Sequence, residues 1–307
     1  MKPGFFASRW LTASLTIFIF NGLYIDASVF DAQENVPLTT FQLIARSDLV
    51  VHARVVDGND RLAAVEVIET FRGESPAVQL RIDFRDLNMQ RRGQEAVLFN
   101  AGEEYIFLLE RPDWRKPTEK NRDIFALFHG RRGRIALPAE GRGVQVEAVE
   151  KLAALVGKTP EDQLAGLRLL VASGNPLLRE SALEELARLR AAGVDDLPAL
   201  SRLLQDPNPN IRAASLDLIS GVMPLPADEA GDAEKRIVLE MCRERARNDL
   251  AEPVRIGAVR VLGSWTVREE VAGDLKAIST GDTSQAVRYE ALRILYGWGM
   301  TGSGRSP

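Results

Sequence analysis

Cysteine and histidine are scarce in this sequence, which has one cysteine and two histidines among 307 residues. A single cysteine excludes an internal disulfide framework and any zinc site built on cysteine pairs. Two histidines supply too little for a multi-histidine metal centre. We therefore predict no metal site and no cofactor. The formal net charge of −4 also lacks the basic excess of a dedicated nucleic-acid binder, so nucleic acid is not an expected partner.

Sequence motifs that would carry catalysis are missing as well. No serine or cysteine nucleophile motif lies beside His52 or His129, and there is no phosphate-binding loop or dinucleotide-binding fingerprint. Cys242 falls in a predicted helix, where a small buried thiol is expected. We predict no catalytic residues and a protein that is not an enzyme.

Long hydrophobic runs are absent apart from ten residues near the N-terminus, Leu11 to Phe20. This run is too short for a spanning helix, which needs about 20 residues, and it follows two positive residues as in a secretory signal peptide. We predict a signal peptide over residues 1–27, cut after Ala27 or alternatively after Ala32, and no membrane span after cleavage. The mature protein is then periplasmic or secreted, and its cysteine poverty favours a bacterial envelope. The alternative is an uncleaved N-terminal membrane anchor.

Residues 28–148 show short β-rich runs separated by turn residues. Val78 to Phe84 alternates strictly between apolar and polar residues, as a strand with one buried face requires. Leu49 to Val56 and Glu104 to Leu109 are further strand-like runs. Five or six such strands in about 110 residues predict a small antiparallel β-barrel or sandwich. The glycines of residues 129–133 predict a hairpin connection between the flanking strands.

Residues 159–299 contain a repeat. An arginine between apolar and small residues recurs with spacings of 33, 43 and 33 residues, at Arg179, Arg212, Arg255 and Arg288. Offsets −1, +3, +4 and +7 from each arginine are apolar or small and share one helical face. A period near 33 with helical spacing predicts an α-solenoid of four helix pairs. The fold class is thus α+β with two domains, a barrel followed by the solenoid, and residues 300–307 predict a disordered tail.

Capping residues mark helix starts inside the repeats. Thr159 followed by Pro160 predicts a helix that begins there, with threonine as the N-cap and proline in the first turn. Thr266 and Glu269 have the spacing of a capping box, which predicts the start of a later first helix.

Four tetrapeptides carry the repeat most clearly: Pro176-Leu177-Leu178-Arg179, Pro209-Asn210-Ile211-Arg212, Glu252-Pro253-Val254-Arg255 and Gln285-Ala286-Val287-Arg288. These units resemble HEAT repeats over nearly half the chain. The resemblance implies that each repeated arginine ties the loop between paired helices, often through an acid such as Asp206; the alternative is a row of anion-binding arginines. It also implies that second helices line the concave side of the array.

A row of charged residues lies five positions past each repeated arginine, at Glu184, Asp217, Arg260 and Arg293. On the concave side, this row would run from acidic to basic and select a partner protein by orientation. The alternative interpretation is a set of solvated surface charges.

The segments Ser47 to Val55, Thr70 to Gly73 and Ala101 to Leu109 resemble the oligonucleotide-binding-type barrel of tissue inhibitors of metalloproteases. Those inhibitors act through an N-terminal cysteine, which this chain lacks. The favoured function is an exported, non-catalytic scaffold that binds another envelope or extracellular protein. The alternatives are a protease-inhibitor-like module that uses the loop Leu87 to Glu95, and a HEAT-repeat enzyme similar to bilin lyases.

Overall fold

The computed structural model describes residues 38–59, 61–84, 99–112, 118, 121–128, 130–226 and 228–300. The predicted signal peptide over residues 1–27 lies outside the described residues. So do the loop from Leu87 to Glu95, His129, and the predicted tail apart from Met300.

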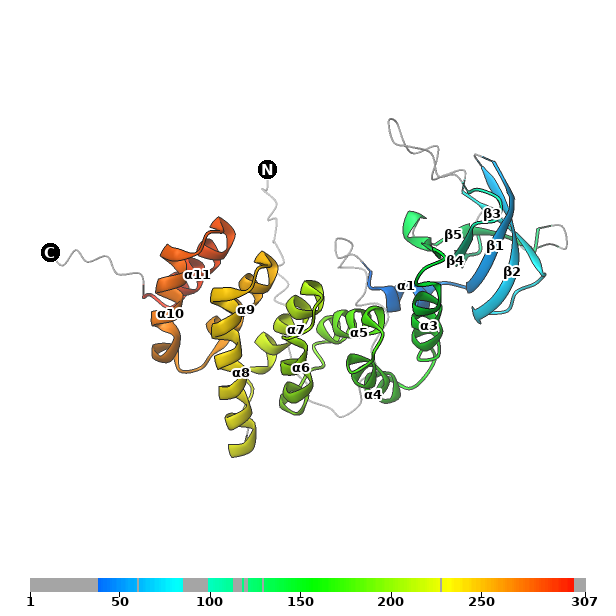
Figure 1. The fold of residues 1–307 in the computed structure, drawn as a ribbon. Helices are drawn as coiled ribbons and strands as arrows, with labels where there is room; N and C mark the ends of the chain where they lie inside the picture. The colour runs from blue at the N-terminus through cyan, green and yellow to red at the C-terminus, as the bar shows by residue number, and fades with distance from the viewer. Residues whose placement is uncertain are drawn as a thin grey trace, which may run out of the picture. The chain divides into compact units, whose positions relative to one another are not determined.

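Six strands form one sheet whose first five close into a barrel (Figure 1). The strands are β1 (Leu49–Gly58), β2 (Leu62–Arg72), β3 (Gln79–Asp83), β4 (Glu104–Glu110), β5 (Ile124–Leu127) and β6 (Arg134–Ala136). The ring runs β1-β2-β3-β5-β4 and returns to β1, which confirms the predicted small barrel. Its pairings are antiparallel except that between β3 and β5, which is parallel.

The glycines of residues 130–133 do not make the predicted hairpin. They form a short 3-10 turn, and β5 and β6 each pair with β4 instead of with each other. Gly133 is required there by a close approach, since a Cβ atom on it would lie 2.4 Å from the carbonyl oxygen of Phe128. Gly133 therefore reflects backbone crowding beside β4, where only a residue without a side chain fits.

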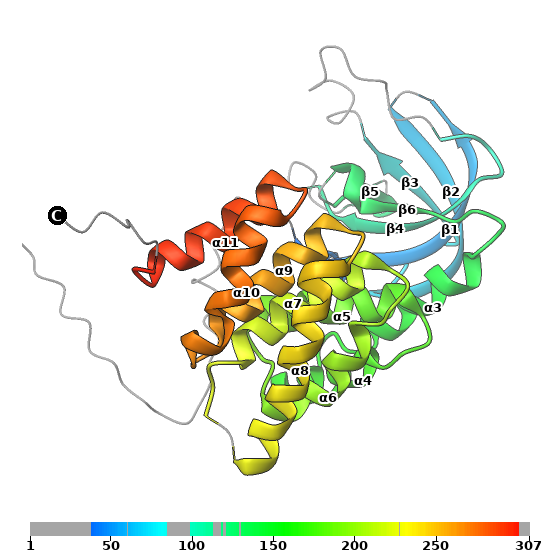
Figure 2. The same ribbon diagram turned by 60° about the vertical axis from the view of Figure 1, so that its left-hand side comes forward.

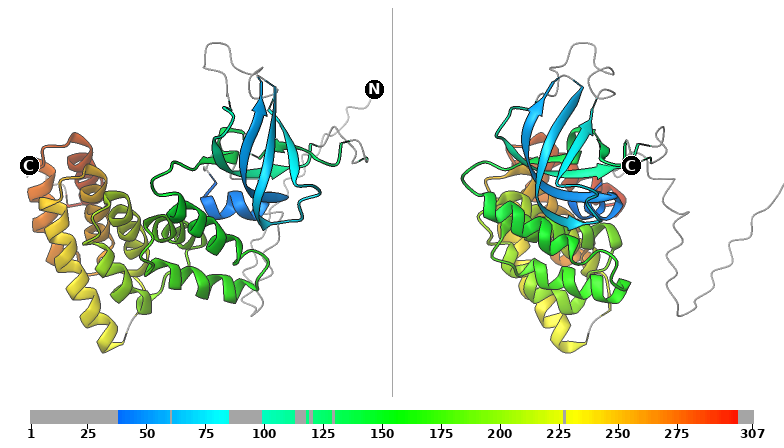
Figure 3. Two further views of the ribbon diagram at one scale, coloured as in Figure 1. Left: turned by 45° about the vertical axis from the view of Figure 1, so that its right-hand side comes forward. Right: turned by 90° about the vertical axis from the view of Figure 1, so that its right-hand side faces the viewer.

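The barrel strands have one face inside and one outside, as their alternating sequences predict. The interior holds an aromatic group in which the Phe99 ring meets those of Phe84, Tyr105 and Phe107 at centroid distances of 5.0, 5.4 and 5.7 Å. The outer face of β1 and β4 is also buried, because Val50, Ile106 and Leu108 belong to the same core as the helices. Two helices precede the repeats and join that core, α1 (Thr40–Arg46) and α3 (Arg142–Ala153), and Figure 3 shows α1 in blue beside the strands.

Gly73, just after β2, supports a stability prediction. Its φ is +77°, and a Cβ atom would lie 2.3 Å from the carbonyl oxygen of Asp48. Gly73→Ala is expected to lower the free energy of unfolding by about 2 kcal/mol, because both the left-handed backbone and the contact are unfavourable. Gly102→Ala is the matched control: its φ is +88° but nothing lies within 4 Å. Urea denaturation that found equal losses for the two variants would contradict the close contact.

Four helix pairs follow the barrel, as predicted, and stack in sequence order (Figures 1 and 2). The pairs are α4 (Pro160–Val171) with α5 (Pro176–Leu189), α6 (Leu197–Leu203) with α7 (Pro209–Val222), α8 (Glu229–Asn248) with α9 (Glu252–Ser264), and α10 (Arg268–Gly281) with α11 (Gln285–Gly297).

Of the two predicted helix starts, one is confirmed and one is wrong. The Thr159 side chain accepts a hydrogen bond from the backbone N–H of Asp162, which confirms the predicted N-cap of α4. The predicted capping box of Thr266 and Glu269 is wrong: α10 begins at Arg268, and its N-cap, Val267, has no side-chain cap. The next acid of that first turn, Glu270, instead accepts a hydrogen bond from the indole N–H of Trp265 at 3.1 Å.

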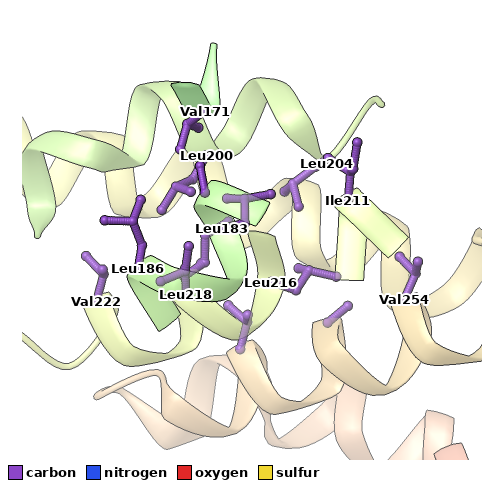
Figure 4. Packing of buried hydrophobic residues seen from close by; sticks show 14 of the residues in the cluster. Val171, Leu183, Leu186, Leu200, Leu204, Ile211, Leu216, Leu218, Val222 and Val254 are labelled. Carbon is purple, nitrogen blue, oxygen red and sulfur yellow. The ribbon is translucent and has the colours of Figure 1, made fainter. Parts of the chain in front are cut away.

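The solenoid core includes the repeated apolar positions of the second helices and apolar residues of the first helices. Residues at −1 and +3 from each repeated arginine are buried in all four repeats, and those at +7 likewise. Figure 4 shows Leu183 and Leu186 of α5 beside Leu216 and Leu218 of α7, with Leu200 of α6 above them. Each pair buries its apolar face against its neighbours, which is why single pairs would not be stable alone.

Candidate partner-binding face

The repeated arginines occupy equivalent surroundings, which form the scaffold beneath the candidate face. In each repeat the arginine Nη1 donates to two backbone carbonyls of its own inter-helix loop, five and six residues earlier. Three of the arginines also bind the aspartate in the next repeat's loop: the pairs are Arg179–Asp206 at 2.8 Å, Arg212–Asp249 at 2.9 Å and Arg255–Asp282 at 2.9 Å. We call this set the Arg–Asp ladder.

Each aspartate of the Arg–Asp ladder also accepts a backbone hydrogen bond within its own loop. Asp206 Oδ1 accepts the backbone N–H of Asn208 at 2.8 Å, and Asp249 and Asp282 accept the N–H two residues on in the same way. One carboxylate therefore orders the loop that begins a second helix and ties that loop to the preceding repeat. The ladder fixes the second helices α5, α7, α9 and α11 relative to one another.

The charged row at +5 lies on these second helices, and each of its four side chains is exposed. The structure brings three of them together. Arg260 Nη1 lies 3.7 Å from Asp217 Oδ1 of the preceding repeat, and Arg260 Nε donates to Glu290 of the following repeat at 3.0 Å. Arg293 also donates to Glu290, at 2.8 Å. Asp217, Arg260, Glu290 and Arg293 thus form a linked set across three repeats, which we call the charge network.

Glu290 is the member of the charge network that the sequence analysis missed. It is buried, and the hydrogen bond from Arg293, together with Arg260, holds the pKa of its carboxyl below the ordinary value against the opposing effect of desolvation. Its i,i+3 spacing to Arg293 was the available signal. Its contact with Arg260 joins residues 30 positions apart and depends on how the helices stack.

Asp217 lies beside a cavity of about 550 Å³ at the ends of α5 and α7. Arg190, Leu218 and Leu225 line the same cavity. Desolvation raises the pKa of Asp217 above its ordinary value, and Arg260 only partly offsets this. The face therefore offers a carboxylate beside apolar surface at one end of the charge network.

Glu184, the first residue of the predicted row, stands apart from the charge network. It lines a separate cavity, of about 360 Å³, bounded by α1, β6, α3 and α5. Desolvation raises the pKa of its carboxyl above the ordinary value, and the nearby Glu180 carboxylate adds to this effect.

Other chemistry-bearing residues have structural surroundings. His52 is buried and its Nε2 lies 2.9 Å from Glu104, a carboxylate that also binds Arg54 and Arg142. Cys242 is buried in α8, where desolvation raises the pKa of its thiol. The guanidinium of Arg134 lies over the Phe99 ring at 5.0 Å.

The described part of the chain shows neither a metal-binding cluster nor a membrane-spanning helix. It holds no group of three or more His, Cys, Asp or Glu side chains placed to bind a metal ion. None of its helices combines the length and the hydropathy needed to span a bilayer.

Comparison with known families gives a match for one of the four helix pairs. A family model of the HEAT repeat matches residues 197–225, which cover α6 and α7. Comparison with curated proteins gives no match.

Several solved structures resemble part of the chain. The complex of CpcE and CpcF of phycocyanin lyase from Nostoc sp. PCC7120 has a TM-score of 0.40 and 18% identity, over 49% of this chain and 89% of that chain. An engineered protein has a TM-score of 0.37 and 16% identity, over 52% and 76% of the two chains. A designed armadillo repeat protein in complex with the peptide (KR)4 has a TM-score of 0.37 and 13% identity, over 50% and 76%.

Proposed function

Because the chain carries HEAT repeats behind a closed five-stranded barrel, we propose that it is a non-catalytic scaffold that binds another protein of the bacterial envelope or extracellular space. The observation that carries this proposal is the Arg–Asp ladder. It holds the second helices in register, so the side chains between them form a fixed array. A preorganised array loses less conformational entropy on binding than a flexible one.

The charge network gives that array its specificity. Glu290 holds Arg260 and Arg293 in place while leaving about half of each side chain exposed, at 49% and 58%. Asp217, also about half exposed, contributes the opposite charge one repeat earlier. Alternating exposed charges on a rigid face favour one orientation of a partner and disfavour partners with mismatched charges.

Two sequence features support a location outside the cytoplasm. The N-terminal apolar run is of signal-peptide length, and one cysteine suits an envelope protein that does not rely on disulfides. The proposed partner is therefore a protein of that compartment.

A charge-swap experiment tests the function. The variant Asp217→Arg/Arg260→Glu/Glu290→Arg/Arg293→Glu inverts every sign of the charge network while keeping its internal pairs oppositely charged and its net charge unchanged. In quantitative capture from envelope extract, the wild-type chain is expected to enrich a partner that this variant loses about tenfold or more, because like charges now meet across the interface.

A matched control distinguishes this effect from a general change in surface charge. The control variant is Glu161→Arg/Arg202→Glu/Glu244→Arg/Lys276→Glu, which makes four reversals with the same net charge on exposed positions of the first helices α4, α6, α8 and α10. It is expected to capture the partner as the wild-type chain does. Equal capture by all three proteins would refute a binding role for the second-helix face, provided that circular dichroism shows each of them folded.

A further inference from the structure

The cavity beside Glu184 is lined partly by apolar and partly by polar side chains. Val149 and Leu152 of α3 are buried apolar residues, and Leu177 of α5 is exposed at its mouth. The polar lining consists of Gln145 of α3, Glu180 and Glu184 of α5, and the hydroxyl residues Thr40 and Ser181. At about 360 Å³, the cavity falls within the size range of small ligand sites, roughly 300–1,000 Å³. It is large enough for one side chain and the backbone next to it.

Acceptors predominate among the polar atoms of this cavity, and one of them has no donor. Gln145 Oε1 is buried and has no hydrogen-bond partner in the described structure, which is a costly state for an amide oxygen. The cavity thus combines this unpaired acceptor on α3 with the carboxylates of Glu180 and Glu184 on α5. These groups would suit a ligand that is rich in N–H donors.

The charge around the cavity is not balanced by the protein's described cations. Glu185, the neighbouring acid on α5, is neutralised by Arg188 at 2.5 Å and accepts the Thr39 hydroxyl at 2.8 Å. Glu180 and Glu184 form no such ion pair among the described residues. Arg132 acts on Glu184 only at longer range, where it opposes the upward shift of that pKa. Two carboxylates against this one cation leave the cavity with a net negative charge.

We propose that this cavity binds an arginine side chain of the partner protein, with the guanidinium at Glu180, Glu184 and Gln145 Oε1 and the aliphatic stem on Val149, Leu152 and Leu177. This inference rests on the proposed function and adds the chemistry of one contact. Arginine fits better than lysine because its planar head carries five N–H donors for acceptors on two helices, and its stem packs on apolar surface.

The chain's own neighbouring segment does not suit the cavity. Residues 28–37, which lead directly into Thr40 at its rim, include Asp31 and Glu34 and no lysine or arginine. Their charge has the same sign as the cavity.

A peptide with one arginine tests the proposal on the full chain. The probe is Ac-Gly-Ala-Arg-Ala-Gly-NH2, and its control replaces the arginine with citrulline, which keeps the shape and removes the charge. We expect the arginine peptide to shift the backbone amide NMR signals of Gln145, Ala148 and Val149, and the citrulline peptide to leave them unchanged. Glu180→Gln and Glu184→Gln are each expected to weaken binding about tenfold, while Glu161→Gln, exposed on α4, should not.

Three results would overturn the proposal: no shift with the arginine peptide, equal shifts with citrulline, or binding that survives Glu180→Gln/Glu184→Gln. An equal response to a lysine peptide would replace arginine recognition with general cation binding. The test is separable from that of the proposed function, since the charge-swap variant leaves Gln145, Glu180 and Glu184 intact. If the swap abolishes capture and the peptide does not bind, the scaffold function stands and this contact falls.

Discussion

Asp249→Asn is expected to lower the free energy of unfolding by about 3–5 kcal/mol, the usual cost of removing one partner from a buried ion pair. Asp249 has a nearly inaccessible side chain, exposed by 1%, and accepts two hydrogen bonds from Arg212 at 2.9 Å each. Its Oδ1 also accepts the backbone N–H of Ala251, the N-cap of α9, which has no side-chain cap of its own. In the variant an amide NH2 replaces the Oδ2 that accepts from Arg212 Nε, so two donors face each other and the guanidinium is left half-paired.

The same substitution should change how stability depends on pH. Burial alone would raise the pKa of Asp249, but the hydrogen bonds and charge of Arg212 outweigh it and hold that pKa below its ordinary value. A carboxyl with a depressed folded-state pKa contributes stability above its unfolded-state pKa of about 3.9, and this contribution is lost as the pH falls below that value. The difference in unfolding free energy between wild type and Asp249→Asn should therefore shrink as the pH falls below about 4.

Asp195→Ala provides the control for both measurements, because Asp195 is exposed and takes no part in the ladder. It is expected to change stability by less than about 0.5 kcal/mol. Guanidinium denaturation that found the Asp249 and Asp195 variants alike would mean that the ladder orders the repeats without stabilising them.

The repeat architecture could be predicted from sequence because it is periodic. Arginines spaced by 33, 43 and 33 residues, with apolar positions at fixed offsets, give the same signal four times, and four helix pairs follow from it. The ladder's aspartates were also visible in part, since Asp206, Asp249 and Asp282 each stand six residues before an arginine. The first repeat has Ser173 at that position, and its hydroxyl accepts the N–H of Asn175 as the aspartates do.

Contacts between distant segments could not be predicted in the same way. Each ladder arginine binds an aspartate 27 or 37 residues further along the chain, so the pairing depends on the spacing of stacked loops. The charge network also joins residues that are far apart in sequence, such as Arg260 and Glu290, so it likewise depends on how the helices stack. The cavity at Gln145 needs α3 beside α5, and α3 falls at the end of the region that the sequence analysis assigned to strands.

Short elements were missed because they carry little periodic signal. Helix α1 has seven residues, too few for an amphipathic pattern, and tertiary packing of Phe41, Leu43 and Ile44 stabilises it. Gly133 was assigned to a turn because glycine serves both turns and close approaches, and only the Phe128 carbonyl distinguishes the two.

Glu104→Gln is expected to destabilise the junction of the barrel and α3 by about 3 kcal/mol, since it removes the buried carboxylate that holds His52 and the half-exposed arginines Arg54 and Arg142, and hydrogen bonds to charged groups are the stronger ones. Glu104 is buried on the outer face of β4, where it meets His52 Nε2 at 2.9 Å, Arg54 Nη2 at 2.9 Å and Arg142 Nη1 at 3.0 Å. Burial opposes ionisation of this carboxylate, but Arg54 and His52 outweigh that effect and hold its pKa below the ordinary value. Chemical denaturation measures the loss.

Glu69→Gln is the matched control, because Glu69 faces His52 from the other neighbouring strand, β2, and is exposed. It is expected to cost less than about 0.5 kcal/mol. If the Glu104 variant were as stable as this control, the desolvation of Glu104 would cancel the gain from its contacts with His52, Arg54 and Arg142.

A double-mutant cycle with Arg142→Ala separates the part of the Glu104 effect that concerns α3. Arg142 is the first residue of that helix, whose N-cap, Gly141, offers no side-chain hydrogen bond, so the ion pair with Glu104 is its main polar tie to the barrel at this end. We expect a coupling energy of about 1 kcal/mol, at the lower end of the range for contacting residues because the Arg142 side chain is 44% exposed. Hydrogen exchange should quicken at the α3 amides in Glu104→Gln and Arg142→Ala but not in Glu69→Gln. Zero coupling, with exchange at α3 unchanged, would mean that the apolar contacts of Ala148, Val149 and Leu152 alone fix this helix. The contacts of Glu104 would then stabilise only the pairing of β1 with β4.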